Sequence, residues 1–271
     1  MSTPAPFAPC GVITLITDLG HKGPYVASMK GVMLGRFPDA RIVDLTHDTL
    51  VHWPAEAGFW LRRSYRYFPP GTVHVAIVDP GVGTSRDIIL VQADRHYFLA
   101  PDNGLLGGLV EAAGTTCVVH RYDRHRAHNL GLPEPSATFH GRDIFAPLAA
   151  DVARGKLKPS AIGPQIRDVV PAWVDEPTKS ARDVRGVVIT SDHFGNLITN
   201  IDGHLLDGLN EPVAEVSGHR IPVVRTYADA TPGEYLALVN SFGVVEIARA
   251  EESAADGLGV QRGAPVRIVA G

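Results

Sequence analysis

Cysteine is scarce in this sequence, which has only Cys10 and Cys117 among its 271 residues. Two cysteines are too few for a disulfide scaffold, and they lack the paired spacing of a zinc site. Scarce, unpatterned cysteine is typical of a protein that works in a reducing compartment. We therefore expect a cytoplasmic location.

Surplus positive charge and long apolar runs are also lacking. Lys and Arg number 25 against 29 Asp and Glu, so the formal net charge is −4. The chain therefore lacks the positive potential that attracts a nucleic-acid backbone. No apolar run approaches the roughly 20 residues of a membrane span. Residues 1–10 have neither the basic region nor the apolar core of a signal peptide, and we expect a disordered tail there. Nucleic acid and membrane are thus not expected partners.

What the chain does contain is a regular alternation of strand and helix patterns over residues 11–170. This alternation predicts an α/β domain with a mainly parallel sheet. Polar residues follow several of the strand patterns directly, namely Asp18, His47, Asp79 and Asn103. Because parallel strands bind ligands at their carboxyl ends, this recurrence predicts a site at that edge of the sheet.

The pattern changes in the second half of the chain. Residues 171–185 are charged, contain two prolines and show no clear period, so we predict a linker. Residues 186–271 contain short strand patterns separated by turn residues, which is typical of a small barrel or sandwich. The predicted strands are 186–190, 197–201, 213–216, 221–224, 235–239, 244–248 and 266–269.

The stretch Val73–Arg86 is the most informative part of the chain. An apolar strand ends on Asp79, Pro-Gly-Val-Gly83 predicts a tight turn, and residues 87–92 form a second strand pattern, so we expect a hairpin. Asp79 and Arg86 would then face each other as a charge-assisted pair, which could be purely structural. A dinucleotide fingerprint is excluded, because Arg86 stands where a third glycine is needed and a strand follows.

The twelve histidines do not form a recognisable metal site. No His-x-x-x-His lies on a predicted helix and no cysteine accompanies the histidines, so we expect no bound metal. His74 lies inside a strand pattern and is expected to be a core residue. A Gly-x-Ser-x-Gly elbow is absent from the sequence, which argues against a nucleophilic serine.

Six motifs occur in a consistent order between Val12 and the C-terminus. They are Thr17-Asp18-Leu-Gly-His-Lys-Gly-Pro-Tyr25-Val, Ile42-Val-Asp-Leu-Thr-His47, Val78-Asp79-Pro-Gly-Val-Gly83-Thr-Ser-Arg86, Pro101-Asp-Asn-Gly104, Thr138-Phe-His140-Gly-Arg-Asp-Ile-Phe-Ala-Pro147 and Asp192-His-Phe-Gly-Asn196. Together they resemble the S-adenosylmethionine (SAM) hydroxide adenosyltransferases, the water-using relatives of the fluorinase and chlorinase enzymes.

The resemblance implies an N-terminal α/β domain, a C-terminal β-barrel domain and a homotrimer. In such a trimer the sites would lie between the N domain of one subunit and the C domain of the next. The implied reaction is attack of water or hydroxide on the ribose C5′ of SAM, which gives adenosine and methionine without a cofactor.

The same resemblance assigns roles to residues. The family's catalytic Asp–Arg–His set corresponds to Asp79, Arg86 and His140. The remaining correspondences are Asp18 for the ribose, Asn196 and Tyr227 for adenine, Arg249 as a further residue on the purine side, and Asp192 and Ser241 for the methionine end. At the methionine end the halogenases differ, with an aspartate where Gly23 stands and an arginine where Phe242 stands.

Two further departures from the halogenases concern the nucleophile. A tyrosine of the fluorinase pocket corresponds to Asp79, and the serine that contacts fluoride corresponds to Gly141. A carboxylate repels a halide but suits a water molecule, so the sequence favours an oxygen nucleophile. A SAM-dependent halogenase and a non-catalytic adenosine or SAM binding protein are the alternatives. The sequence does not indicate which sulfonium epimer is used, and clearance of the R epimer is one hypothesis.

Overall fold

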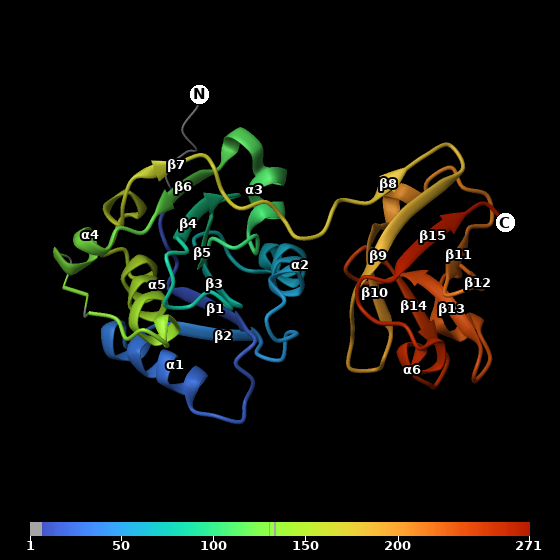
Figure 1. The fold of residues 1–271 in the computed structure, drawn as a ribbon, viewed down its shortest axis with the longest axis horizontal. Helices are drawn as coiled ribbons and strands as arrows, with labels where there is room; N and C mark the ends of the chain where they lie inside the picture. The colour runs from blue at the N-terminus through green and yellow to red at the C-terminus, as the bar shows by residue number, and fades with distance from the viewer. Residues whose placement is uncertain (1–6, 130, 133) are drawn as a thin grey trace. The chain divides into compact units, whose positions relative to one another are not determined.

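The computed structural model describes residues 7–129, 131–132 and 134–271 (Figure 1). The chain divides into two compact units, Met1–Trp173 and Val174–Gly271, and each has a hydrophobic core of its own. This division falls within residues 171–185. That stretch also contains strand β8 (Thr178–Lys179) and the beginning of β9 (Asp183–Ser191).

The first unit is built from a sheet with helices on both faces. Its elements in chain order are β1 (Val12–Thr17), α1 (Tyr25–Arg36), β2 (Arg41–Thr46), α2 (Pro54–Ser64), η1 (Tyr65–Tyr67), β3 (Val73–Ile77), β4 (Ile88–Ala93), β5 (His96–Pro101), α3 (Gly107–Ala113), η2 (Gly114–Thr116), β6 (Val118–Arg121), α4 (Arg124–Asn129), the π-helical turn η3 (Gly141–Phe145), α5 (Ala146–Ala153), η4 (Pro159–Ala161) and β7 (Gln165–Ile166).

The sheet of the first unit has seven strands in the order β2-β1-β3-β5-β4-β6-β7. Strands β2, β1, β3 and β5 are parallel neighbours, which confirms the predicted α/β class. Strands β4, β6 and β7 complete the sheet with antiparallel pairings. The predicted hairpin implied that β4 runs opposite to β3, whereas the pairings of β6 and β7 were not predicted.

The predicted hairpin over residues 73–92 is wrong, because β5 lies between β3 and β4. The actual hairpin joins β4 to β5 through Asp94 and Arg95, which both have positive φ angles, 46° and 64°. A two-residue turn with two positive φ angles matches the twist of antiparallel strands, so β5 folds back on β4 and takes the place next to β3.

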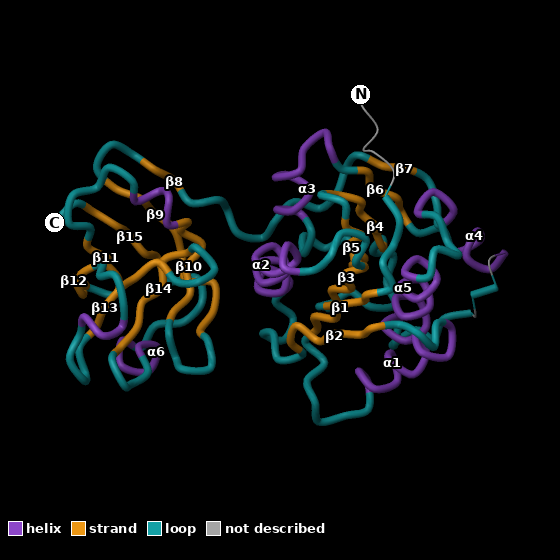
Figure 2. Tube along the Cα trace, turned by 180° about the vertical axis from the view of Figure 1, so that it is seen from behind, coloured by secondary structure: helices purple, strands orange, loops and turns teal. Residues whose placement is uncertain are grey.

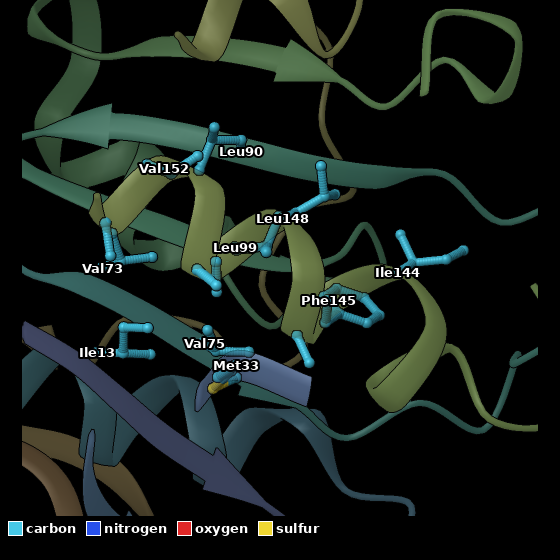
Figure 3. Close-up of a cluster of buried hydrophobic side chains, with 14 of the residues drawn as sticks. Ile13, Met33, Val73, Val75, Leu90, Leu99, Ile144, Phe145, Leu148 and Val152 are labelled. Carbon is cyan, nitrogen blue, oxygen red and sulfur yellow. The ribbon is translucent and has the colours of Figure 1, made fainter. Parts of the chain in front are cut away.

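The core of the first unit lies on both faces of this sheet. Helices α1 and α5 cover one face, where Leu148 and Val152 pack among strand residues such as Val73 and Leu90 (Figure 3). Helices α2 and α3 cover the opposite face through Ala57, Leu61 and Leu109, together with Leu105 and Leu106 from the turn before α3. Strands β1, β3, β4 and β5 are therefore buried on both sides, as their apolar runs require, whereas β2 at the edge is largely exposed.

Helix boundaries follow the sequence in part. Helix α1 begins directly after Pro24, and its apolar face with Val26 and Met29 is buried. The carboxylate of Asp102, just before α3, accepts a hydrogen bond from the backbone N–H of Val170 at 2.9 Å and does not cap that helix. The polar stretch 122–127 contains the start of α4.

The second unit is built from strands and the loops that join them, with only short helical turns (Figure 2). After β8 and β9 its elements are β10 (Leu197–Asp202), η5 (Gly203–Leu206), β11 (Val213–Val216), β12 (His219–Pro222), η6 (Tyr227–Asp229), β13 (Tyr235–Val239), β14 (Val244–Arg249), α6 (Ala254–Leu258) and β15 (Pro265–Val269). Each of the seven predicted strands is present.

The sheet of the second unit curls toward closure. Its strands follow the order β12-β11-β15-β9-β10-β14-β13, and β8 pairs with β9. Beyond the end of β12, Val223 forms an isolated bridge with Ala237 in β13, which links the two edges of the sheet. This nearly closed arrangement confirms the predicted barrel. In the described ranges of both units, the helices are too short or too polar to cross a membrane.

Candidate active site

The polar residues at the strand ends share one edge of the first sheet, as predicted. Asp18, His47, Asp79 and Asn103 follow β1, β2, β3 and β5, which are adjacent parallel strands. The side-chain amide of Asn103 donates to the backbone carbonyl of Val78 at 2.8 Å and so fixes the end of β3. This edge is where parallel α/β sheets place their ligands.

Asp79 and Arg86 form a tight ion pair in the loop that follows β3. The Nε of Arg86 lies 2.9 Å from each carboxylate oxygen of Asp79, and the terminal Nη2 also donates to Oδ2. Only 6% of the Asp79 side chain and 11% of the Arg86 side chain are exposed. A pair held by several hydrogen bonds away from bulk water keeps one geometry, so its charges are preorganised.

His140 completes this group from a distant part of the chain. Its Nδ1 lies 2.9 Å from Nη2 of Arg86. A guanidinium can only donate, so Nδ1 accepts and the ring proton of the neutral imidazole is on Nε2. Burial and the nearby positive charge of Arg86 lower the pKa of His140 below 6.5. The imidazole is therefore neutral at pH 7 and presents an Nε2–H donor.

A glycine allows the two segments that carry Arg86 and His140 to meet. Gly83 has a φ of 78°, and a Cβ atom there would lie 2.2 Å from the backbone oxygen of Ala137. Only glycine fits both the backbone conformation and this close approach. The loop after β3 can therefore lie directly against the segment that leads into His140.

Asp143 stabilises the segment that leads into His140. Its Oδ2 accepts from the backbone N–H of Ser136 at 2.9 Å and from the Ser136 hydroxyl at 2.5 Å, while Arg142 binds the same carboxylate. Hydrogen bonds from Arg142 and Ser136 lower the pKa of Asp143 to about 2. The carboxylate is thus charged at neutral pH and holds together the two sides of the turn that contains His140.

A cavity of about 340 Å³ adjoins this group within the first unit. Arg86 and His140 form part of its wall, together with the polar side chains of Thr84 and Ser136. A water molecule occupies about 30 Å³ in the liquid, so the cavity has room for several. Two members of the Asp79–Arg86–His140 group are therefore accessible to small molecules.

The loop that holds Asp18 is fixed by polar contacts around the buried His47. Thr17 Oγ1 lies 2.9 Å from Nδ1 of His47, and Nε2 of His47 lies 3.1 Å from Oδ1 of Asp44. Oδ2 of Asp18 accepts from the backbone N–H of His52 at 3.0 Å, which leaves Oδ1 as an acceptor for a ribose hydroxyl. Burial lowers the pKa of His47, so this chain is built around a neutral histidine.

In the second unit, Asp192 organises the turn that carries Asn196. Its Oδ1 accepts from the backbone N–H groups of Phe194 and Asn196, both at 2.9 Å. Its Oδ2 accepts from the Asn196 side-chain amide at 3.0 Å. Asn196 is buried and its amide is held in one orientation. Asp192 therefore positions Asn196, a contact that the sequence motif did not predict.

Tyr227 lies near this turn and is anchored at its hydroxyl. The residue is 50% exposed, while its hydroxyl donates to Oε1 of the buried Glu246 at 2.6 Å. Burial and Glu246 raise the pKa of Tyr227, and the charge of Asp192 adds to this effect. Ser241 is exposed and follows Asn240, whose amide also donates to Glu246 at 3.1 Å. The structure thus groups Asp192, Asn196, Tyr227 and Ser241.

Arg249 does not join this group. Side chains alternate along a strand, so Glu246 and Arg249 leave β14 on opposite faces. The guanidinium of Arg249 lies over the ring of Tyr235 and pairs with Glu252 at 2.6 Å, and its Nε donates to the carbonyl of Gly233 at 2.9 Å. These contacts support a structural role.

Glu246 and Asn240 were missed by the sequence interpretation. A charged residue in the middle of the apolar strand Val244–Ala248 is the one signal that could have singled out Glu246. Asn240 is identified only by its contact with that carboxylate.

The buried histidines of the core do not take part in the site. His74 has no exposed surface, its Nδ1 hydrogen-bonds with Thr14 Oγ1 at 2.7 Å, and its Nε2 with Nδ1 of His96 at 3.1 Å. It is the satisfied core residue that its strand pattern predicted. Among the residues that the structure describes, no three His, Cys, Asp or Glu side chains converge in a way that could hold a metal ion.

Comparisons with known proteins cover nearly the whole chain. The model of the SAM hydroxide adenosyltransferase N-terminal domain matches residues 13–163, and that of the C-terminal domain matches residues 186–267. A protein of Thermus thermophilus named (R)-S-adenosyl-L-methionine hydrolase is 36% identical over 95% of this chain and 99% of its own length. A protein of the same name from Salinispora arenicola is 38% identical over 96% of this chain and 98% of its own length.

A solved structure shares the fold over the same extent. The crystal structure of an uncharacterized conserved protein from Thermotoga maritima superposes with a TM-score of 0.85 at 33% identity, and it covers 95% of this chain and 99% of its own. Both domain models, the curated relatives and the fold agree. The chain belongs to the SAM hydroxide adenosyltransferase family.

Proposed function

We propose that this protein hydrolyses SAM to adenosine and methionine, with water as the nucleophile at the ribose C5′. The observation that carries the proposal is the Asp79–Arg86–His140 group, in which a carboxylate and a neutral imidazole are both held by one guanidinium. Family membership and the hydrolase names of the relatives support it.

The reaction needs a well-placed nucleophile more than a strong base. The sulfonium of SAM leaves as the neutral thioether of methionine, so the leaving group needs no protonation. Water forms the new C5′–O bond as the C5′–S bond breaks, and one water proton is released. Because oxygen becomes strongly acidic once it is bonded to C5′, a nearby carboxylate is a sufficient acceptor for that proton.

Each member of the group has a distinct task in this proposal. The Nε2–H of His140 donates to the water oxygen and so turns a lone pair toward C5′. The carboxylate of Asp79 accepts a hydrogen bond from the water and then its proton, which passes on to solvent. Arg86 holds both partners in place, and such positioning accounts for a large part of enzymatic rate enhancement.

Substrate recognition is divided among the remaining residues. We propose that Oδ1 of Asp18 accepts from the ribose hydroxyls, that the Tyr227 ring stacks on adenine and that the fixed Asn196 amide bonds the purine edge. Ser241 is proposed to contact the methionine end. Both Asp192 oxygens are used within the turn, so Asp192 contributes by orienting Asn196.

Incubation of the purified protein with SAM tests the proposal directly. We expect adenosine and methionine in equal amounts by liquid chromatography, and an unchanged rate after treatment with EDTA. A 5′-halo-5′-deoxyadenosine formed in chloride or fluoride would instead indicate a halogenase, and tight SAM binding without products would indicate a binding protein.

The sulfonium epimer and the oligomeric state are separate parts of the proposal. The relatives are named for the R epimer, and we propose that the R epimer is the preferred substrate here. Rates measured on the resolved R and S epimers test this, and a faster rate on S would contradict it. We also propose a homotrimer, which light scattering of the eluting protein would show as three times the 29.0 kDa chain mass.

A further inference from the structure

Glu246 is an unusual residue for its position. It lies within β14 among apolar neighbours, and only 3% of its surface is exposed. Burial of a carboxylate is unfavourable unless hydrogen-bond donors compensate for the lost water. The two donors that this structure provides both come from the group of polar residues described above.

These donors attach two separate loops to the one carboxylate. Tyr227, in the short helix η6, donates its hydroxyl to Oε1 at 2.6 Å. Asn240, after β13, donates its side-chain amide to Oε2 at 3.1 Å. Each oxygen of Glu246 thus holds a different segment.

Asn240 also holds the turn that carries Ser241 by hydrogen bonds. Its Oδ1 accepts from the backbone N–H of Phe242 at 2.9 Å and of Val244 at 3.4 Å. The amide group of Asn240 is therefore used on both sides, with its nitrogen on Glu246 and its oxygen on the turn. The orientation of the Ser241 turn depends on which way this amide points.

The register of the sheet places the start of β10 next to Glu246. Ile198 in β10 lies directly opposite Glu246 in β14, so their side chains share one face of the sheet. Asn196 directly precedes β10, two residues before Ile198. Tyr227 and the Ser241 turn are thus both attached to one buried anion, close in the sheet to the strand that follows Asn196.

We propose that Glu246 is the positioning residue of the nucleoside site, because it fixes the ring of Tyr227 for a purine and the Ser241 turn for the other end of the substrate. This inference rests on the proposed function, since it assigns Tyr227 to adenine and Ser241 to the methionine end. Without the tether the half-exposed ring of Tyr227 is mobile, and ordering it on binding weakens affinity.

The two oxygens of Glu246 allow the two tethers to be broken one at a time. In Glu246→Gln, the amide oxygen can still accept from the Tyr227 hydroxyl, but the amide nitrogen then faces the nitrogen of Asn240. Asn240 must turn away or rotate its amide, and either change removes an acceptor from Phe242 N. Tyr227→Phe has the opposite effect, because it keeps the ring and the Ser241 turn but removes the phenol tether.

Calorimetry with adenosine and steady-state kinetics with SAM measure the two effects. Glu246→Ala should raise the adenosine Kd and the KM for SAM about tenfold, the loss expected for a hydrogen-bonded charged anchor. In Glu246→Gln the adenosine Kd should stay within about threefold of wild type while the KM for SAM rises. In Tyr227→Phe the adenosine Kd should rise. In all three variants kcat should remain within about threefold, because the Asp79–Arg86–His140 group is untouched.

Asp183→Asn is the matched control for lost stability. Asp183 is a buried carboxylate in the same unit, paired with Arg185 and Arg267 at 2.9 and 2.6 Å. This variant should lower the Tm and leave the adenosine Kd unchanged. Equal loss of adenosine affinity in Asp183→Asn and Glu246→Ala would overturn the inference, as would a Glu246→Ala protein that binds adenosine like wild type.

Failure of the proposed function gives a different result. Adenosine affinity is measured without turnover, so a wild-type protein that binds adenosine through Glu246 but forms no product from SAM would contradict only the hydrolase proposal. A wild-type protein that hydrolyses SAM while Glu246→Ala keeps its affinity and KM would contradict only the role of Glu246.

Discussion

The two units hold their polar side chains in contrasting ways. In the first unit, Asp79 and Arg86 are almost fully buried and their charges bind each other and His140. In the second unit, the buried charge of Glu246 is directed at hydroxyl and amide groups, and the ring of Tyr227 is left half exposed.

This contrast separates two physical tasks. Fixed charges in a water-poor site stabilise a charge distribution that develops during a reaction. An exposed aromatic ring and an oriented amide offer stacking and hydrogen bonds that a bound nucleoside gains before any reaction. We therefore expect substitutions in the first group to change kcat and those in the second to change KM.

Asp79→Asn should produce the largest effect. Asparagine keeps the shape of the side chain but removes the negative charge that accepts the water proton, so kcat should fall by about 10²–10⁴. The KM for SAM should stay within a few-fold. Initial rates of adenosine release measure both parameters.

Asp94→Asn is the control for Asp79→Asn. Asp94 is also an aspartate of the first unit that pairs with an arginine, Arg66 at 3.4 Å, but its side chain is 50% exposed. Exposed pairs contribute little, so its rate should match wild type. An Asp79→Asn protein with a near-normal kcat would remove the distinction between the two units.

Tyr227→Ala should produce the next largest effect, and this effect should appear in the KM for SAM and not in kcat. Loss of a stacking ring commonly weakens binding of a base by about 1–3 kcal/mol, which corresponds to about a fivefold to 150-fold higher KM for SAM. The kcat at saturation should remain within about threefold. Tyr67→Ala, which removes an exposed tyrosine of the first unit, serves as control. A loss of kcat rather than KM would contradict the separation.

Much of the fold could be predicted because its signals are local. Apolar runs that end on polar residues placed Asp18 and Asp79 at one sheet edge, and turn residues marked the strands of the second unit. The pairing partners of β4 depended instead on Asp94 and Arg95, which adopt positive φ angles without the glycine that usually indicates such a turn.

The candidate site also contains residues that local sequence signals identify and residues that they do not. A sequence motif can identify Asp79, Arg86 and His140, and their contacts agree with the sequence interpretation. The anchoring of Tyr227 depends on Glu246, which lies on another element, and no local pattern links the two. Arg249 has contacts that the sequence does not reveal, because they depend on the face of β14 from which it leaves.

The pH dependence of stability should also differ between the two units. Among the described residues of the first unit, four histidines are buried, and burial lowers the pKa of each, in His74 to about 3. Residues 174–271, all described, contain no buried histidine. Unfolded histidine titrates near 6.5, so below that pH the unfolded first unit binds protons that the folded one does not. Its stability should fall as the pH decreases from 6.5, by about 1.4 kcal/mol per pH unit for His74.

Tryptophan fluorescence can measure this difference, because Trp53, Trp60 and Trp173 all lie in the first unit. Between pH 7 and pH 5, the urea midpoint measured by fluorescence should fall more than the urea midpoint measured by circular dichroism, which reports both units. His74→Gln keeps a neutral hydrogen-bonding side chain and should flatten the dependence. Equal shifts by both probes would contradict the assignment of acid sensitivity to the first unit.

Gly141→Ser should produce the smallest effect, and it tests how far the choice of nucleophile depends on Asp79. A Cβ atom at Gly141 would lie 3.0 Å from the sulfur of Met29 and 3.2 Å from the ring of Phe139, so we expect a stability loss of about 1 kcal/mol. The rate of adenosine release should stay within about threefold, because the Asp79–Arg86–His140 contacts do not involve this position. A hydroxyl supplied here cannot compensate for the negative charge of Asp79, which still repels a halide. Chromatography after incubation with SAM and high chloride should therefore show adenosine and no 5′-chloro-5′-deoxyadenosine, and a chlorinated product would mean that position 141 rather than Asp79 selects the nucleophile.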